Sequence, residues 1–221
     1  MSSAQGLDVS GVGYTREDLP VVGSGELLDL GAWFGGLEGR ALDLEIGSGK
    51  GTFLVQQAGL EPGVCFVGVE HALGFWRHAA DRVRRHGLEN VRLLHADADT
   101  LVKHQLPAGV LRTCHIYFPD PWPKARHHKR RLVQAPFLRA LCGVLGPSGT
   151  VRLVTDHQEY FAWMEEHAAA VQAEGLFERL AYEPPASAGE GEWVGTNFER
   201  KYKKEGRTIQ GMILAKKQGE A

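Results

Sequence analysis

Short apolar runs alternate with longer amphipathic stretches along most of this chain. Five of the runs have the length and composition of buried strands: 41–46, 65–70, 91–95, 113–118 and 150–155. The stretches between them have helical spacing, at 52–58, 72–85, around 99–104 and 132–145, with Gly146-Pro147 expected to end the last helix. Because strands that alternate with helices usually pair in parallel, we predict an α/β fold with a doubly wound, mainly parallel sheet.

The C-terminal third departs from this alternation. A further helix is expected over 157–174, ended at Gly175, and two more strands at 177–182 and 207–216. Only a loop is expected between these two strands, so we predict an antiparallel pair at the sheet edge and seven strands in total. The loop over 183–198 is long for a compact domain, and such loops are often functional. It either closes over a bound substrate or is an ordinary surface excursion.

Length and composition limit the organisation of the chain. With 221 residues and 43% hydrophobic content, we predict one domain over 26–221, preceded by a flexible tail over 1–25. Cys65, Cys114 and Cys142 are unclustered and odd in number, which favours neither disulfides nor a metal site. The sequence shows no stretch long enough for a membrane span and no leader pattern, so we expect a cytoplasmic protein.

Charge is distributed unevenly along the chain. The formal net charge is −2, yet five cations lie in 124–131 without an acid, and seven lie in 200–217 with only Glu205. Two such runs favour a local phosphate-binding face over a uniformly basic protein. The alternative for either run taken alone is a solvated surface.

A glycine-rich turn follows the first predicted strand, with the sequence Glu45-Ile46-Gly47-Ser48-Gly49-Lys50-Gly51. Glycines let the backbone turn sharply and approach a ligand closely. Glu70 ends the second strand, where a carboxylate can accept ribose hydroxyls, and Asp97 follows the third, near an adenine edge. The alternative for each acid is a helix cap or a surface residue.

The spacing of the glycines argues against a dinucleotide. Gly47-x-Gly49-x-Gly51 lacks the Gly-x-Gly-x-x-Gly register that places a pyrophosphate on a helix N-terminus. Glu45 would repel a pyrophosphate, whereas it suits the cationic amino and sulfonium end of S-adenosylmethionine. We therefore predict S-adenosylmethionine as the cofactor, with a nicotinamide oxidoreductase as one alternative and a non-catalytic RNA-binding scaffold as another.

Asp120 lies in a proline-rich segment, Phe118-Pro119-Asp120-Pro121-Trp122-Pro123, which runs directly into the first basic stretch. Prolines fix φ and favour extended geometry at the residue before them, so neither helix nor central strand is expected here. Asp120 is therefore predicted on a stiff loop beside phosphate-binding cations. Trp122 either stacks on a base or anchors the loop by packing beneath it.

Taken in order, these motifs closely resemble the bacterial tRNA (guanine-N7)-methyltransferases, which are class I S-adenosylmethionine-dependent enzymes. The resemblance runs from about Leu42 to Leu214. It rests on the glycine turn, Gly68-Val69-Glu70, His95-Ala96-Asp97-Ala98 and the Asp120 segment with its basic tail; downstream, Thr155-Asp156 and Thr196-Asn197-Phe198-Glu199 also match. Asn197 stands where the family often has Lys.

The resemblance implies methyl transfer from S-adenosylmethionine to N7 of guanine 46, in the variable loop of tRNA. The oligomeric state is left open between a monomer and a homodimer. The positions that match cofactor contacts are Glu45, Glu70, Asp97 and Asp120, with the turn glycines Gly47, Gly49 and Gly51. Asp120 also matches the proposed active-site acid. Positions that match substrate contacts are Lys124, Asp156, Thr196, Asn197, Phe198 and Glu199, and the RNA-interacting segment contributes Arg126, Lys129, Arg130 and Arg131.

The chemistry needs little from the protein beyond placement. Guanine N7 carries a lone pair and no proton, so direct in-line attack requires no general base, and catalysis is expected from alignment and electrostatics. A carboxylate that accepts the N1 and N2 protons would select guanine, and Asp120 is the first candidate for this role. Asp156 is the second, although it also fits an N-cap for the helix near His157.

Overall fold

The computed structural model describes residues 6–218. These residues form two compact units, one ending at Pro107 and one beginning at Ala108. Each unit has four strands, so the described part of the chain contains eight strands, where the sequence predicted seven. The expectation of a single domain over 26–221 stays a prediction.

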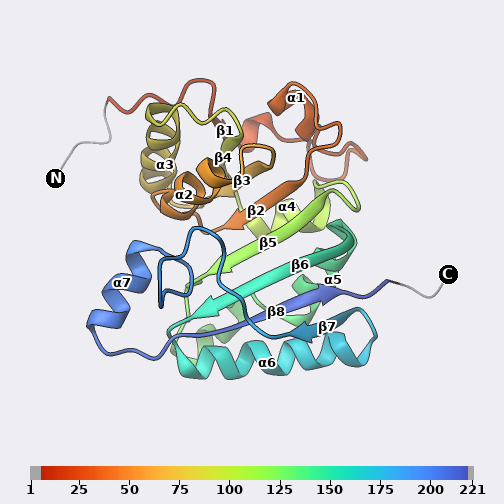
Figure 1. Cartoon of the computed structure of the whole chain (residues 1–221). Helices are drawn as coiled ribbons and strands as arrows, with labels where there is room; N and C mark the ends of the chain where they lie inside the picture. The colour runs from red at the N-terminus through yellow and green to blue at the C-terminus, as the bar shows by residue number, and fades with distance from the viewer. Residues whose placement is uncertain (1–5, 219–221) are drawn as a thin grey trace. The chain divides into compact units, whose positions relative to one another are not determined.

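The N-terminal unit has an all-parallel sheet with strands in the order β1-β4-β3-β2 (Figure 1). Its strands are β1 (Gly13–Thr15), β2 (Leu42–Ile46), β3 (Cys65–Val69) and β4 (Val91–His95), and its helices are η1 (Arg16–Asp18), α1 (Leu30–Phe34), α2 (Thr52–Leu60), α3 (Leu73–Arg85) and α4 (Ala98–His104). β2 and β3 are buried along their whole length, as parallel strands covered by helices should be.

Gly68 in β3 allows α2 to lie close against the sheet. A Cβ atom at this position would lie 2.4 Å from Cδ1 of Leu54 in α2 and 2.8 Å from Cδ1 of Leu93 in β4. Any side chain here would push the helix away from the strand. The close packing holds the first turn of α2 next to the end of β3, where the glycine-rich turn lies.

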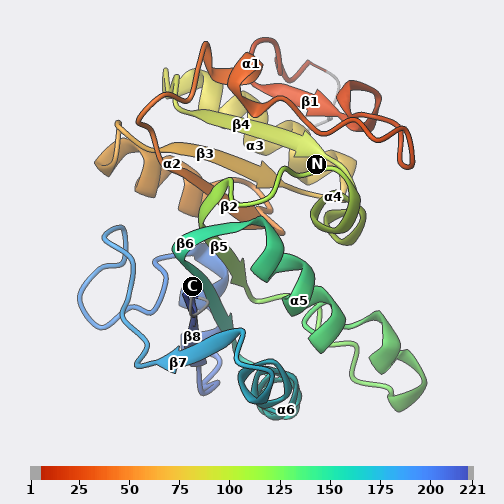
Figure 2. The ribbon, with the colours of Figure 1, turned by 90° about the vertical axis from the view of Figure 1, so that its right-hand side faces the viewer.

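The C-terminal unit has a mixed sheet. Its strands are β5 (Leu111–Tyr117), β6 (Leu145–Thr155), β7 (Phe177–Leu180) and β8 (Gln210–Lys216), and its helices are η2 (Ala125–Arg130), α5 (Ala135–Val144), α6 (Gln158–Ala173) and α7 (Asn197–Lys204). β5 and β6 are parallel, whereas β8 runs antiparallel to both β6 and β7, which confirms the predicted antiparallel pair. Figures 1 and 2 show α6 running alongside β7 and β8.

Three local features differ from the sequence prediction. Gly13–Thr15 form β1 within the stretch 1–25 that was expected to be a flexible tail, of which residues 1–5 lie outside the described range. α7 lies between β7 and β8, where only a loop was expected. Gly146-Pro147 lie inside β6 and α5 already ends at Val144. β1 is too short to give a periodic pattern, and α7 buries only Glu199, so neither gave a hydrophobic signal.

No helix within residues 6–218 combines the length and apolar character that a membrane crossing needs. The three cysteines are buried thiols. Within the same range, no group of three or more metal-ligating side chains comes together.

Candidate functional site

The glycine-rich turn leaves β2 through three left-handed residues. Gly47, Gly49 and Gly51 have φ values of 77°, 54° and 69°, which residues with a Cβ rarely adopt. The backbone N–H groups of Gly47 and Ser48 donate to the carbonyl of Val69, at 2.8 and 3.2 Å. The turn is thereby fastened to the end of β3.

Glu70 holds this turn through both carboxylate oxygens. Oε2 accepts the N–H of Gly49 at 2.8 Å, and Oε1 accepts the N–H of Ala72, just before α3, at 2.7 Å. Each oxygen keeps a second lone pair, so the ribose contact predicted for Glu70 stays compatible with these bonds. This turn-holding role could not be predicted from local sequence, because the contact with Gly49 spans 21 residues.

Glu45 is a buried carboxylate with an unsatisfied oxygen. The residue is 4% exposed, and its Oε2 has no hydrogen-bond partner in the part of the chain that the structure describes. Burial, together with the nearby charge of Glu70, raises the pKa of Glu45 to about 8. Such a group is costly to leave unpaired. The free oxygen fits a cationic ligand group, so the residues here fit the charged end of S-adenosylmethionine.

Asp97 is the N-cap of α4. Its Oδ1 accepts the N–H of Thr100 at 2.8 Å, and the residue is exposed. The capping alternative is therefore correct for this acid. The predicted nucleoside contact does not conflict with the cap, since the carboxylate is still open to solvent, and it stays a prediction.

The proline-rich loop after β5 has an unexpected backbone. Phe118 and Trp122 both precede prolines, yet their φ values are 53° and 43°, so the predicted extended geometry is wrong at both positions. A non-glycine residue held in this region costs roughly 1–3 kcal/mol and persists only where its surroundings enforce it. The loop is therefore held in place, as expected, but its backbone is strained at Phe118 and Trp122.

Asp120 lies between these two strained residues. It is exposed, and it forms no hydrogen bond or ion pair with any residue in 6–218. Its negative charge contributes to raising the pKa of Tyr160 and of Tyr202, after the larger effect of burial, which places it near both rings. Asp120 is therefore a free carboxylate on a fixed loop.

Arg131 does not belong to the exposed cations predicted to bind phosphate. Its side chain is 1% exposed. Nε donates to the carbonyl of Pro121 at 2.8 Å, and Nη2 donates to Glu159 Oε1 at 2.9 Å. The guanidinium lies 5.1 Å from the ring centres of both Tyr160 and Trp163. The phosphate contact stays a prediction for this residue, and its burial and its bonds to Pro121 and Glu159 argue against it.

The remaining cations of the first run are free. Lys124, Arg126, Lys129 and Arg130 are exposed on or beside η2, and none pairs with an acid of the described chain. Neither helix nor strand forms over 118–123, as its prolines predict, and the basic residues beyond it form a 3₁₀ helix over 125–130. Arg130 lies 5.0 Å from the ring centre of Trp122 and His127 meets the same ring edge-on, so Trp122 packs under the basic segment.

The second basic run is largely neutralised by its own neighbours. The ion pairs are Arg200 with Glu192, Lys201 with Glu205, Lys203 with Glu199, and Arg207 with Asp156 and Glu205. Lys216 donates to the carbonyl of Leu145. Most of this run is therefore better described as solvated surface than as a phosphate-binding face. The cations over 124–130, in contrast, have no acidic partners in the described chain.

Asp156 is engaged in an ion pair and does not cap α6. The N-cap is His157, whose Nδ1 accepts the N–H of Tyr160, so the capping alternative for Asp156 is wrong. Oδ2 of Asp156 instead accepts from Arg207 Nη1 at 2.6 Å. The Arg207 guanidinium lies 4.4 Å from the ring centre of Tyr202, which also contacts the rings of Phe118 and Phe198.

Tyr202 thus joins the proline loop, Asp156 and the start of α7 into one surface. Nothing in the sequence singled out Tyr202 or Arg207. The available signal was weak: an aromatic residue and a cation within a run that otherwise indicates a solvated helix.

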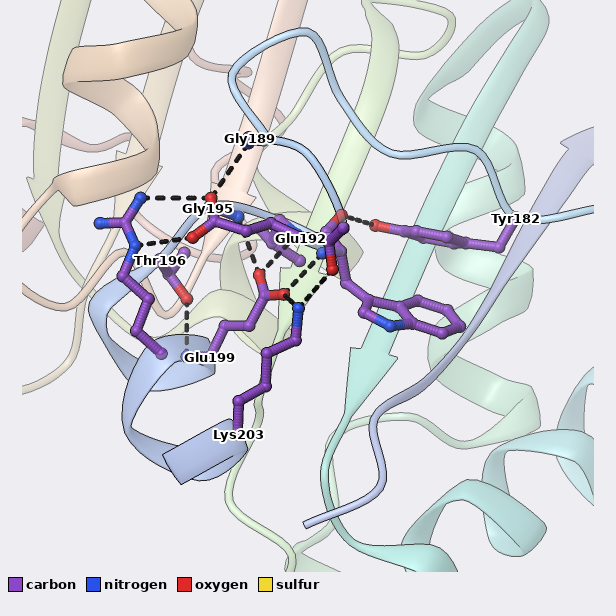
Figure 3. A network of polar contacts seen from close by, with 11 residues as sticks. Tyr182, Gly189, Glu192, Gly195, Thr196, Glu199 and Lys203 are labelled. Carbon is purple, nitrogen blue, oxygen red and sulfur yellow. Dashed lines mark hydrogen bonds and ion pairs between the residues drawn. The ribbon is translucent and has the colours of Figure 1, made fainter. Parts of the chain in front are cut away.

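Glu199 is the centre of a polar network that fixes the long loop before α7 (Figure 3). The side chain is fully buried and accepts the N–H groups of Trp193, Val194 and Gly195, at 2.6, 2.8 and 2.9 Å. Lys203 pairs with it at 2.7 Å. Burial alone would raise the pKa of Glu199, but the bonds from Lys203 and the three amides hold it below its ordinary value.

The Thr-Asn-Phe-Glu motif is therefore divided between two tasks. Thr196 is the N-cap of α7 and accepts the N–H of Glu199 at 3.2 Å, so both residues serve the local structure. Phe198 is 47% exposed and Asn197 is also exposed. Substrate contact stays a prediction for the motif, and Phe198 has the most exposed side chain for it.

The chain matches, over residues 40–212, a family model described as "Putative methyltransferase". It is 38% identical over 195 residues to a tRNA (guanine-N(7)-)-methyltransferase of Nitrosomonas eutropha, covering 86% of this chain and 81% of the relative. The enzyme of the same name from Halorhodospira halophila is 38% identical over 192 residues, covering 85% and 79%. The chain belongs to the tRNA (guanine-N7)-methyltransferase family. The resemblance drawn from the motifs is confirmed.

Solved structures give the fold. The 16S rRNA methyltransferase KamB matches with a TM-score of 0.59 at 16% identity, over 86% of this chain and 94% of that one. The aminoglycoside resistance methyltransferase NpmB1 matches with a TM-score of 0.55 at 16% identity, over 80% and 88%. The predicted α/β fold with a mainly parallel sheet is confirmed, and it is the Rossmann-like fold of these methyltransferases. The protein is a methyltransferase, and its methyl donor is S-adenosylmethionine.

Proposed function

We propose that this protein methylates N7 of a guanine in the variable loop of tRNA, at position 46, in the cytoplasm. The observation that carries the proposal is the exposed, unpaired carboxylate of Asp120 on a fixed loop, directly followed by four unpaired cations. A carboxylate beside free positive charge suits a base within a polyanion.

The cofactor residues lie in the N-terminal unit. S-adenosylmethionine would supply an electrophilic methyl group on a positively charged sulfur. Glu45 would accept the cationic end of the cofactor with its free Oε2, and Glu70 would accept ribose hydroxyls with its second lone pairs. The three left-handed glycines keep side chains out of the space beside the turn. Asp97 would face the adenine edge.

Asp120, and not Asp156, is proposed to read the guanine edge. Asp156 is occupied by Arg207 at 2.6 Å, so guanine binding there would first have to break a charge-assisted bond. Asp120 has no such partner to lose. Its two oxygens can accept the N1 and N2 protons together, and adenine lacks that pair of donors. The negative charge also favours the positive charge that develops on the purine.

No residue needs to remove a proton in this reaction. Guanine N7 attacks with its own lone pair, so the protein contributes alignment and electrostatic stabilisation. At saturating S-adenosylmethionine and tRNA, the single-turnover rate should therefore stay flat between about pH 6 and 8. A rate that rises tenfold per pH unit over this range would require a general base and contradict the proposal.

The four exposed cations of the first run are proposed to bind tRNA phosphates. These contacts fix the register of the RNA without reading sequence. Phe198, exposed beside Tyr202, offers an aromatic face to an unstacked base. The segment from Lys124 to Arg130 therefore holds the RNA backbone, while the proline-rich loop and α7 contact the base.

The decisive experiment uses the purified protein, labelled S-adenosylmethionine and unmodified tRNA. Nucleoside analysis should find 7-methylguanosine, and a tRNA with adenine at position 46 should accept no label. Label in another nucleoside, or at a guanine outside the variable loop, would contradict the proposal.

A further inference from the structure

We propose that Arg131 is a positioning residue for Asp120, acting through the carbonyl of Pro121 and not through RNA. The inference rests on the proposed role of Asp120. Arg131 would then differ from the other cations of the basic run, because it would act within the protein and they would bind RNA.

The first support is burial. Arg131 is 1% exposed and is among the largest fully buried side chains in the described chain, while Lys129 and Arg130 beside it are exposed. A buried cation needs partners for its charge and its donors. Arg131 finds one on α6, in Glu159, and one on the proline loop, in Pro121.

The second support is the position of the loop partner. Pro121 directly follows Asp120, and its carbonyl accepts Nε of Arg131 at 2.8 Å. Pro121 has no N–H, so its carbonyl is the single backbone group by which a hydrogen bond can hold this residue. The planar guanidinium therefore fixes the residue next to the carboxylate.

The third support is the strained backbone on both sides of Asp120. Phe118 and Trp122 have left-handed φ values that only a well-supported loop keeps. The Phe118 end is held by its N–H, which donates to Val154 at 2.8 Å, and by the ring of Tyr202. Arg131 supplies the support on the other side.

The anchor itself is rigid. The guanidinium lies 5.1 Å from the ring centres of both Tyr160 and Trp163, and the Tyr160 hydroxyl accepts the N–H of Val133 at 3.3 Å. Trp163 Nε1 donates to the carbonyl of Val133 at 2.9 Å. Both rings of α6 are thus fastened to the chain just after Arg131, and they restrict where its head group can lie.

The test compares Arg131→Lys with Lys129→Met, an exposed cation of the same run. For Arg131→Lys we expect the single-turnover rate at saturating tRNA to fall on the order of 10- to 100-fold, because a small displacement of a catalytic group has this effect. The dissociation constant for tRNA and its salt dependence should match wild type. Lys129→Met should show the opposite pattern, with weaker binding and a salt slope reduced by about 1.

Glu159→Gln provides a second variant that does not depend on a buried substitution, since the Glu159 side chain is 55% exposed. It should fold normally and give a smaller loss of rate, and the double variant with Arg131→Lys should lose less than the product of the two single losses. Tryptophan fluorescence and thermal melting confirm folding. If Arg131→Lys unfolds, the Glu159→Gln result carries the test.

Arg131 would be a phosphate contact, and the proposal overturned, if Arg131→Lys weakened tRNA binding with a lower salt slope at an unchanged rate. An unchanged rate in Glu159→Gln would also overturn it. Failure of the proposed function is distinguishable, because wild type would then produce no 7-methylguanosine at all.

Discussion

The glycine-rich turn after β2 and the proline-rich loop after β5 reach similar backbone geometry by different routes. In the turn, the left-handed positions are Gly47, Gly49 and Gly51, for which this conformation costs little. In the loop, they are Phe118 and Trp122, which pay a steric cost. The turn therefore needs little outside support, whereas the loop needs the contacts of Arg131 and Tyr202.

The acids of the two regions, Glu45 and Asp120, also differ in their surroundings. Glu45 is buried and its pKa is raised to about 8, so it keeps its proton near neutral pH until a cationic partner stabilises its ionised form. Asp120 is exposed and has no partner, so it is free to meet a base. One site uses burial to favour a charged ligand, and the other uses a rigid backbone to present a charge.

The largest expected effect is at the loop. Asp120→Asn should lower the single-turnover rate on the order of 10²- to 10³-fold, because the fixed negative charge is lost. Calorimetry should show S-adenosylmethionine affinity only modestly changed. Asp156→Asn is the matched control and should lose less, since its carboxylate is already paired. A collapse of cofactor affinity in Asp120→Asn would instead place this acid in the cofactor site.

The next effect concerns the buried acid of the turn. In the unfolded chain the pKa of Glu45 is near 4.5, and in the folded protein it is about 8. The folded state therefore keeps a proton that the unfolded state loses, so this group's contribution to stability falls as pH rises from about 4.5 to 8.

Glu45→Gln should remove this dependence and stabilise the free protein at pH 8 by on the order of 1–3 kcal/mol, while weakening S-adenosylmethionine binding. Thermal melting from pH 5 to 8 measures the difference between the two proteins. Parallel pH curves for wild type and variant would show that Glu45 does not titrate as described.

A smaller effect tests the backbone of the turn. Gly51→Ala should destabilise the protein by about 1–2 kcal/mol, because φ is 69° and the new Cβ would lie 3.2 Å from Cβ of Ala79. Gly59 is an exposed position in α2, the helix that begins directly after Gly51, and no atom lies within 4 Å of a Cβ added there. Gly59→Ala should therefore stabilise the protein by up to about 1 kcal/mol. Urea unfolding compares the two, and equal effects would refute the conformational argument.

The smallest effect concerns the free cations beside the loop. Arg126→Met should reduce the slope of log affinity for tRNA against log salt by about 1, because one phosphate contact is lost. Lys201→Met is the control. Lys201 is in the second run and already pairs with Glu205, so its loss should leave the slope close to wild type. The reverse result would move the RNA-binding surface to α7.

Residues adjacent in sequence determined much of this protein. Runs of apolar residues placed β2 to β6 and their helices, because burial on both faces leaves a continuous hydrophobic signal. The order of the glycine turn, Glu70, Asp97 and the Asp120 segment was enough to indicate the family. Glycines and prolines act on their own backbone, so their effect can be read locally, although Phe118 and Trp122 show that the surroundings can still override it.

Only the tertiary structure decided which of several similar side chains are available. Arg131 and Arg130 are neighbours in one basic run, yet one is buried against α6 and the other is exposed. Asp156 and Asp120 are both acids after buried strands, yet Arg207 pairs with the first alone. Glu199 holds three amides where a substrate contact was expected. Burial and pairing depend on residues far away in sequence, and folding alone brings those residues together.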